Sequence, residues 1–305
     1  MPLVFWKTTL NASFDLALEA ARAAAGLQHY PAATLYVVAT PIGNLSDISL
    51  RALHVLGMVD AIGCEDTRHT QTLLRQYGVN KPLLPVHEHN EAEAALTVIN
   101  RLQRGERVAY VSDAGTPAIS DPGARLVAAV RAAGFKSMPL PGASSVTTAL
   151  SVAGISGDSS FVFAGFLPSK AGERDQAVQT FLTEKRAVVI LEAPHRMEAL
   201  ARACAPLGER AITVARELTK QFEEIATLPA SELPTWLAAN PQRLRGEFAL
   251  VLHPAPQAAA ADDGGRVLKL LLAELPLKTA VKLAAEITGA SRNELYNAAL
   301  KLKAE

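Results

Sequence analysis

The chain has 305 residues, a length that favours two domains with a smaller appendage. Its 30 Lys and Arg residues balance 30 Asp and Glu residues, which excludes a general attraction to polyanions and restricts any nucleic-acid contact to local basic patches. Its cysteines, Cys64 and Cys204, exclude a disulfide framework and form no Cys-x-x-Cys zinc pair, as expected of a protein in a reduced cytoplasm. We expect no membrane contact, because no apolar run approaches the roughly 18 residues of a membrane span.

Residues 1–33 are rich in alanine and predict a loose helix that Pro31 ends. We treat this segment as an extension outside the core fold, because the first buried strand is predicted only at residues 35–39. Further short apolar runs alternate with helical patterns; they lie at residues 60–64, 83–86, 108–111 and 138–140. This alternation predicts an α/β domain with a doubly wound sheet over residues 34–153.

Polar loops follow these strands, at the edge of the sheet where α/β folds bind ligands. The loop at residues 111–123 carries Asp113 and Thr116, which suit a small polar ligand, whereas Asp121 is assigned to the start of the following helix. Neither a Gly-x-Gly-x-x-Gly motif after the first strand nor a P-loop is present, so no nucleotide phosphate site is predicted. The segment His87-Glu88-His89 does not predict a metal site, since neighbouring residues of a strand point to opposite faces.

Longer apolar runs predict a second α/β domain over residues 154–253; they lie at residues 161–164, 188–191, 212–215 and 248–252. Residues 254–265 contain only Pro, Ala, Gln, Asp and Gly and predict a flexible linker. The last part, residues 266–305, holds seven basic and four acidic residues, a modest basic patch. It predicts two helices joined at Gly289, an arrangement typical both of a helix-turn-helix and of a plain helical hairpin.

The polar loops, taken in order, resemble the motifs of a known enzyme family. They are residues 40–45 (TPIGNL), 64–68 (CEDTR), 87–90 (HEHN), 112–117 (SDAGTP), 141–144 (PGAS), 192–196 (EAPHR) and 216–220 (RELTK). They resemble the bacterial small-subunit rRNA (cytidine-2'-O)-methyltransferases of the tetrapyrrole methylase superfamily, and the C-terminal helical segment resembles the appendage of that family. The resemblance implies two α/β domains with S-adenosylmethionine in the cleft between them, and a homodimer. It also implies 16S rRNA, near the decoding centre, or the small ribosomal subunit as substrate.

The same resemblance implies a set of site residues. Cofactor contacts are expected from Ile42, Asp113, Thr116, Ser144, Ser145, Leu191 and Ala249. Substrate contacts are expected from Arg68, Asn90, Arg196 and Arg216 and, in the basic C-terminal segment, from Lys278, Lys282 and Arg292. Transfer of a methyl group to a ribose hydroxyl needs alignment of the reacting atoms and removal of one proton. The candidate proton acceptors are Glu65, Asp66, His87 and Lys220, and no metal is expected.

Two other functions stay open at the level of the sequence. The first is a C-methyltransferase of the same superfamily that acts on a tetrapyrrole. Evidence against it comes from the motifs at residues 64–68 and 87–90 and from the basic segment. The second is a non-enzymatic RNA-binding module that works through residues 266–305. A structural role would also account for some of the candidate residues. Asp66, for example, can pair with Arg68 on a solvated loop.

Overall fold

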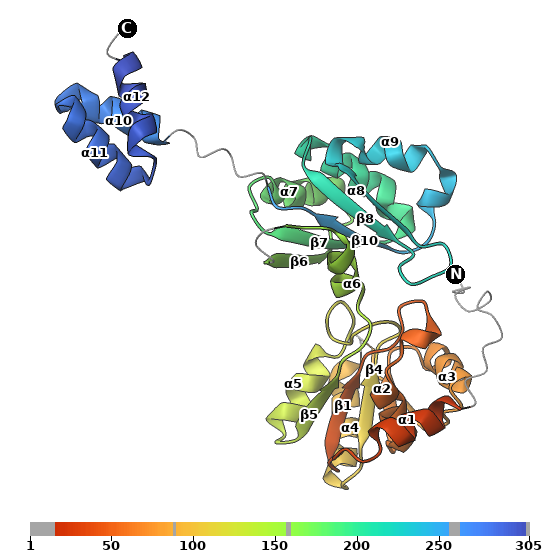
Figure 1. Ribbon diagram of the computed structural model, residues 1–305. Helices are drawn as coiled ribbons and strands as arrows, with labels where there is room; N and C mark the ends of the chain where they lie inside the picture. The colour runs from red at the N-terminus through yellow and green to blue at the C-terminus, as the bar shows by residue number, and fades with distance from the viewer. Residues whose placement is uncertain (1–15, 88–89, 157–159, 256–262, 303–305) are drawn as a thin grey trace. The chain divides into compact units, whose positions relative to one another are not determined.

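The computed structural model describes residues 16–87, 90–156, 160–255 and 263–302 (Figure 1). The chain divides into two compact units, residues 1–254 and residues 255–305. The larger unit contains two five-stranded sheets. Within the described ranges, no helix is long and apolar enough to cross a membrane.

The first sheet is parallel, with the strand order β3-β2-β4-β1-β5. Its strands are β1 (Thr34–Val38), β2 (Ala61–Cys64), β3 (Leu83–Pro85), β4 (Val108–Val111) and β5 (Lys136–Leu140). One face is covered by α2 (Leu50–Met58) and α3 (Thr67–Gln76), and the other by α4 (Glu91–Gln103) and α5 (Ala124–Ala132). Coverage of both faces explains why β2 and β4 are apolar and buried along their whole length. The predicted doubly wound sheet is thereby confirmed, and its parallel strands bring the polar loops to one edge.

The N-terminal helix α1 (Ala17–Ala25) is part of the core of the first sheet. Ala21 and Ala25 are 0% and 2% exposed, and α1 packs against α2. The ring of Tyr30 packs against that of His54 in a tilted arrangement, with 5.0 Å between the ring centroids. Our expectation of an extension outside the core fold was therefore wrong for these residues, because small alanine side chains let α1 approach α2 closely. Residues 1–15 lie outside the described residues.

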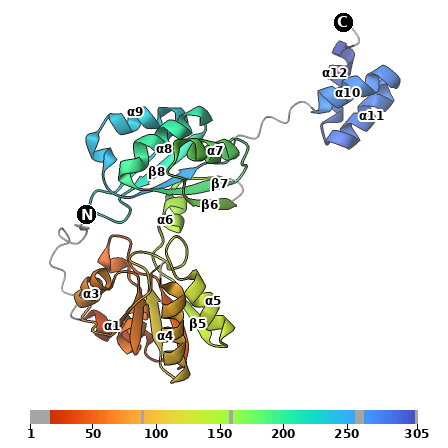
Figure 2. The same cartoon turned by 180° about the vertical axis from the view of Figure 1, so that it is seen from behind.

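The second sheet is mixed, with the order β6-β7-β10-β8-β9. Its strands are β6 (Phe161–Phe166), β7 (Ala187–Glu192), β8 (Ala211–Arg216), β9 (Glu224–Pro229) and β10 (Phe248–Leu252). β6 and β7 are parallel, whereas β10 runs antiparallel to both β7 and β8. One face carries α7 (Ala171–Phe181), α8 (Met197–Cys204) and α9 (Leu233–Ala238), and α6 (Ser145–Val152) packs on the other (Figure 2).

The C-terminal unit is a bundle of α10 (Asp263–Glu274), α11 (Leu277–Thr288) and α12 (Arg292–Leu302). Its core includes Leu268 from α10, Ala284 from α11 and Leu295 from α12. Gly289 ends α11 in the left-handed conformation, with φ of 71°, as predicted. The predicted linker was too long, because α10 begins at Asp263 and its burial in the bundle outweighs the poor helix propensity of the glycines that follow.

Candidate functional site

The loops at the carboxyl edge of the first sheet are tied to one another by hydrogen bonds. Thr40, after β1, exchanges two backbone hydrogen bonds with Gly115, after β4, at N···O distances of 2.9 and 3.0 Å. The hydroxyl of Thr116 donates to the carbonyl of Ala143, after β5, at 3.0 Å. Three loops that are distant in the sequence therefore form one continuous surface.

A pocket of about 340 Å³ lies on this surface and is completed by the second sheet. The loops of the first sheet and the start of α6, the helix that packs on the second sheet, contribute Ile42, Ala114, Gly115, Thr116, Ile119, Ser120, Asp121, Ser144, Ser145 and Val146. The second half contributes Phe166, Leu191, Glu192, Ala193, Pro194, Ala215, Leu218, Glu247, Phe248 and Ala249. The pocket thus gathers six of the seven residues expected to contact a cofactor: Ile42, Thr116, Ser144, Ser145, Leu191 and Ala249.

Three carboxylates that were not predicted to belong to a site also line the pocket: Asp121, Glu192 and Glu247. Burial raises the pKa of Asp121 and that of Glu192. Asp121 was wrongly taken as the start of a helix, because α5 is capped at Gly123. The buried carboxylate of Glu91 meets that helix end instead and accepts hydrogen bonds from two of its backbone amides, at 2.9 and 3.0 Å. A distant residue supplies the cap, which no local pattern reveals.

Asp113 holds two loops together and is not among the residues that line the pocket. Its carboxylate accepts a hydrogen bond from the backbone N–H of Asp66 at 3.2 Å. Its carbonyl oxygen lies 3.1 Å from Nε2 of His69. Burial raises the pKa of the Asp113 carboxyl. This aspartate therefore fixes the loop after β2 relative to the loop that forms the pocket floor.

None of the four candidate proton acceptors is among the residues that line the pocket. Asp66 caps α3 by accepting the backbone N–H groups of Arg68 and His69 at 2.8 and 3.4 Å, bonds that lower its pKa. The ammonium of Lys220 donates to Glu217 at 2.8 Å and to Glu247 at 3.2 Å. The other two candidates follow neighbouring strands: Glu65 comes after β2 and His87 after β3. Glu88 and His89, which complete the motif, lie outside the described residues.

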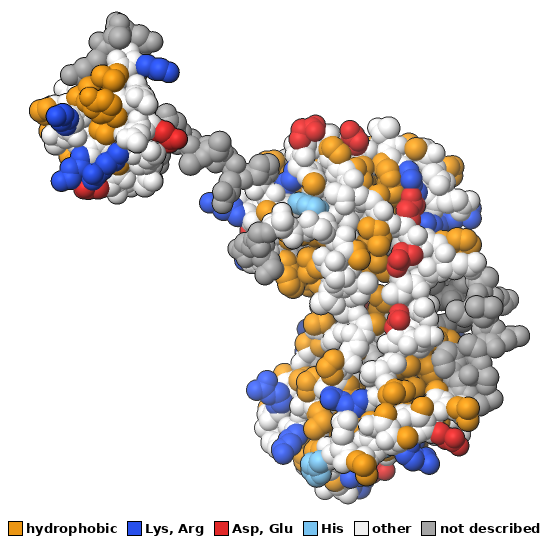
Figure 3. All heavy atoms as spheres, viewed as in Figure 1, with side chains coloured by type: hydrophobic (Ala, Val, Ile, Leu, Met, Phe, Trp, Pro, Cys, Tyr) orange, Lys and Arg blue, Asp and Glu red, His pale blue; other side chains and the backbone are white. Residues whose placement is uncertain are grey.

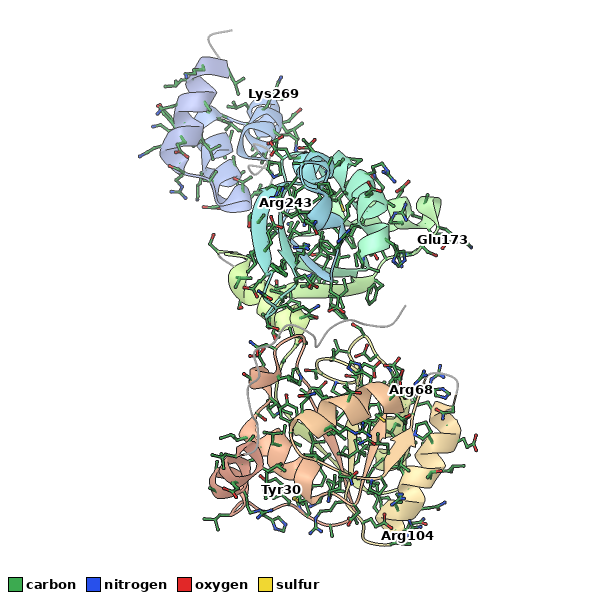
Figure 4. The ribbon with its side chains drawn as sticks, turned by 90° about the vertical axis from the view of Figure 1, so that its right-hand side faces the viewer. Tyr30, Arg68, Arg104, Glu173, Arg243 and Lys269 are labelled. Atoms are coloured by element: carbon green, nitrogen blue, oxygen red, sulfur yellow. The ribbon has the colours of Figure 1, made fainter. Side chains whose placement is uncertain are left out.

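The candidate substrate residues of the larger unit divide into one exposed arginine and three internally bonded side chains. Arg68 projects from the start of α3, and its side chain is 93% exposed (Figure 4). Asn90 binds locally, since its amide donates to the carbonyl of Pro85 at 3.0 Å. The other two arginines are engaged within the fold: Arg196 by Glu192 and the Leu167 carbonyl, and Arg216 by the Arg245 and Phe222 carbonyls. A phosphate at either of them would compete with these bonds.

The C-terminal unit presents its expected substrate residues to solvent. Lys278 and Lys282 are exposed one helical turn apart on α11. Arg292 is exposed at the start of α12 and pairs with Glu286 at 3.2 Å. Basic and apolar side chains lie beside one another on the face of this unit seen in Figure 3. Among the residues that the structure describes, no three His, Cys, Asp or Glu side chains gather as a metal site requires.

Comparison with known families matches both units. Residues 34–234 match the family model of the tetrapyrrole (corrin/porphyrin) methylases, and residues 258–303 match the model described as the RsmI C-terminal HTH domain. The chain is 49% identical over 276 residues to the ribosomal RNA small subunit methyltransferase I of Pseudomonas aeruginosa. The aligned region covers 88% of this chain and 98% of that protein. It is 47% identical over 271 residues to the protein of the same name from Escherichia coli O157:H7, covering 88% and 94%.

Solved structures share the fold at low sequence identity. The cobalt precorrin-4 methyltransferase CbiF superposes with a TM-score of 0.54 at 17% identity, covering 72% of this chain and 94% of that one. A uroporphyrin-III C-methyltransferase from Thermus thermophilus, complexed with S-adenyl homocysteine, superposes with a TM-score of 0.50 at 15% identity, covering 72% and 96%. These likenesses confirm the predicted fold.

Proposed function

Because this chain belongs to the ribosomal RNA small subunit methyltransferase I family of the tetrapyrrole methylases, we propose that it methylates the 2'-hydroxyl of a cytidine ribose in 16S rRNA. S-adenosylmethionine is the proposed methyl donor. The observation that carries the proposal is the pocket, which collects six of the residues expected to contact this cofactor. Relatives that bear the rRNA name are 43–49% identical to this chain, whereas the solved tetrapyrrole methyltransferases compared above are 15–17% identical to it. The C-methyltransferase and the non-enzymatic alternatives are therefore less favoured.

The residues of the pocket fit the proposed cofactor. Its volume of about 340 Å³ is within the range of small-molecule sites. Leu191, Ala249 and Phe248 offer apolar surface to an adenosine, while the hydroxyls of Thr116 and Ser144 offer hydrogen bonds. The carboxylates of the pocket favour a cationic sulfonium over an anion. When bound, the sulfonium supplies a methyl group that is already activated for transfer.

The protein's own contribution is to align the acceptor oxygen and to remove one proton. Of the four candidate proton acceptors, Asp66 caps a helix and the ammonium of Lys220 donates to two carboxylates. We assign proton removal to Glu65 or His87, because both follow paired parallel strands and so lie at the carboxyl edge of the sheet, where the pocket also lies. A ribose hydroxyl is a poor nucleophile at neutral pH, so transfer depends chiefly on positioning.

RNA contacts in this proposal come from both units of the chain. Arg68 is the exposed arginine of the loop after β2 and offers a fork of donors to a phosphate. Lys278, Lys282 and Arg292 supply positive charge in the C-terminal unit. We also propose, from the resemblance, that the enzyme is a cytoplasmic homodimer. Sedimentation at micromolar concentration tests the dimer, and a monomer would reject it.

Methyl incorporation tests the proposed reaction. Purified protein is incubated with radiolabelled S-adenosylmethionine and small ribosomal subunits or naked rRNA from a strain that lacks this activity. The expected product is a new 2'-O-methylcytidine, detected by mass spectrometry of nucleosides. Ala249→Phe, which fills the wall of the pocket, should abolish incorporation while thermal unfolding shows that the protein remains folded. Absence of the product with the native enzyme, or methylation of a precorrin instead, would reject the proposal.

A further inference from the structure

Two large apolar side chains at the pocket are turned toward solvent. Phe166 is 54% exposed and comes from the second α/β half, while Ile119 is 53% exposed and comes from the first. Other apolar residues of the same pocket, such as Phe248 and Ala249, are each 3% exposed. Phe166 and Ile119 therefore contribute little to the core and form an apolar rim at the pocket.

A bulge in the second sheet puts Phe166 on this rim. Phe163 pairs with Val189, but the register shifts before Gly165, so that Phe166 pairs with Leu191. Val189 and Leu191 are two residues apart and face the pocket side of the sheet. Strict alternation would put Phe163 and Phe166 on opposite faces, because they are three residues apart. The bulge inserts one extra residue between Phe163 and Gly165, which shifts the alternation by one position. Phe166 therefore points to the same face of the sheet as Leu191.

The backbone before Ile119 is also unusual. Ala118 has φ of 65°, a left-handed conformation that L-amino acids other than glycine rarely adopt. On strand β6, Gly165 has φ of 64°, and a Cβ there would make only an ordinary contact with the ring of Phe163, at 3.8 Å. A left-handed residue thus precedes each exposed apolar side chain; the conformation is strained at Ala118 and is readily adopted by Gly165. A strained conformation such as that of Ala118 persists where the surrounding structure requires it, which is typical of binding sites.

We propose that Phe166 and Ile119 hold the base of the nucleotide whose ribose is methylated. The inference rests on the proposed function and adds to it a residue pair that determines acceptance of the substrate. Sequence-specific recognition of RNA uses single-stranded nucleotides, whose unstacked bases pack against aromatic or apolar side chains. The rim offers that surface to a neutral base, while the nearby carboxylates of Asp121 and Glu247 disfavour a phosphate. The buried apolar residues deeper in the pocket remain for the cofactor.

The test compares Phe166→Ala with Phe161→Ala, which removes an exposed phenylalanine at the other end of the same strand. Steady-state methylation of small subunits and calorimetric binding of S-adenosylhomocysteine are measured for both variants. Loss of one stacked base predicts that kcat/KM for RNA falls roughly 5- to 150-fold in Phe166→Ala. Cofactor affinity should stay within twofold of the native value, and Phe161→Ala should resemble the native enzyme. Phe166→Tyr, which keeps the ring, should restore most of the activity.

The outcomes are distinct. An equal loss of cofactor affinity in Phe166→Ala would overturn the inference, because the ring would then contact the cofactor. Equal activity of Phe166→Ala and Phe161→Ala would overturn it as well. Ile119→Ala supplies an independent check, since its effect should be smaller and should not add fully to that of Phe166→Ala if both side chains touch one base. Failure of the native enzyme to methylate small-subunit RNA would instead reject the proposed function.

Discussion

Lys220, from the second α/β half, lies directly against Gly43 of the first half. A Cβ at Gly43 would overlap Cγ of Lys220 and lie 2.9 Å from its Cε. The lysine cannot easily move aside, because its ammonium is held by Glu217 at 2.8 Å and by Glu247 at 3.2 Å. Glu247 itself lines the pocket. This contact therefore joins the two halves next to the candidate cofactor site.

Gly43→Ala should destabilise the larger unit by about 1 to 3 kcal/mol through this overlap and should weaken cofactor binding. Lys220→Ala removes both overlapping carbons, so the part of the cost that comes from the overlap should disappear in the double variant, while the backbone cost of a side chain at φ of 157° should remain. Urea unfolding and calorimetric titration with S-adenosylhomocysteine measure both effects. Additive costs in the double-mutant cycle would show that the lysine is not what excludes a side chain at position 43.

Asp66 gives a prediction for the pH dependence of stability. Its pKa is lowered in the fold by hydrogen bonds from backbone amides, chiefly that of Arg68. The carboxylate therefore stabilises the fold above its ordinary pKa of 3.8, and this contribution is lost as the pH falls through the lower pKa of the folded state. Asp66→Ala should cost about 1 kcal/mol at neutral pH, and the difference from the native protein should shrink in acid.

Asp66→Asn is the matched control for this prediction, because asparagine caps helices without titrating. It should retain most of the stability at pH 7 and lose the acid dependence that the native carboxylate contributes. Denaturant unfolding at several pH values from neutral to acidic measures the difference. A cost for Asp66→Ala that is the same at every pH would mean that the charge of the carboxylate does not stabilise α3.

Arg68 and Arg216, both predicted to contact the substrate, should respond differently to substitution by alanine. Arg68 is 93% exposed, whereas Arg216 is 9% exposed and donates to the Arg245 carbonyl at 2.7 Å. Arg68→Ala should leave the melting temperature unchanged but lower RNA affinity. The slope of log affinity against log salt should fall by about one, as expected for the loss of one phosphate contact. Arg216→Ala should destabilise the unit by about 1 to 3 kcal/mol, because it removes a buried side chain whose hydrogen bonds hold the carbonyls of Arg245 and Phe222. If instead Arg216→Ala unfolds like the native protein and binds RNA poorly, its role is in recognition.

The buried strands were largely predictable from the sequence, but the edge strand β9 was not. The buried runs that became β1, β2 and β4 are continuous and apolar, as parallel strands covered on both faces must be. β9 was missed, because Glu224–Pro229 at a sheet edge alternates between exposed and half-buried positions and follows a polar loop.

At the candidate site, the positions of the loops were predictable from the sequence, but the directions of their side chains were not. Ile42 and Thr116 were placed at the pocket through ordered motifs, which fix the position of a loop on the sheet. Asp113 and Asp121 follow one strand within the same loop, yet Asp121 lines the pocket and Asp113 binds the neighbouring loop. That choice depends on backbone conformations such as the left-handed Ala118 between them. Tertiary hydrogen bonds stabilise such conformations, and no local pattern encodes them.

The basic residues of the C-terminal unit should contribute an electrostatic part of RNA affinity. Lys278→Ala, Lys282→Ala and Arg292→Ala combined remove three exposed charges. If each holds a phosphate, the slope of log affinity against log salt should fall by roughly 2 to 3, with little change in cofactor binding.

The control for this prediction combines Arg131→Ala and Lys136→Ala, two exposed basic residues at the end of α5 and the start of β5. Because β5 is parallel to its neighbour, Lys136 lies at the sheet edge opposite the polar loops, away from the candidate site. This variant should keep the native salt slope, as measured by filter binding of rRNA between 50 and 300 mM salt, a range of about the width needed to resolve such slopes. Equal slopes for all three proteins would mean that the helical unit does not bind RNA phosphates through these side chains.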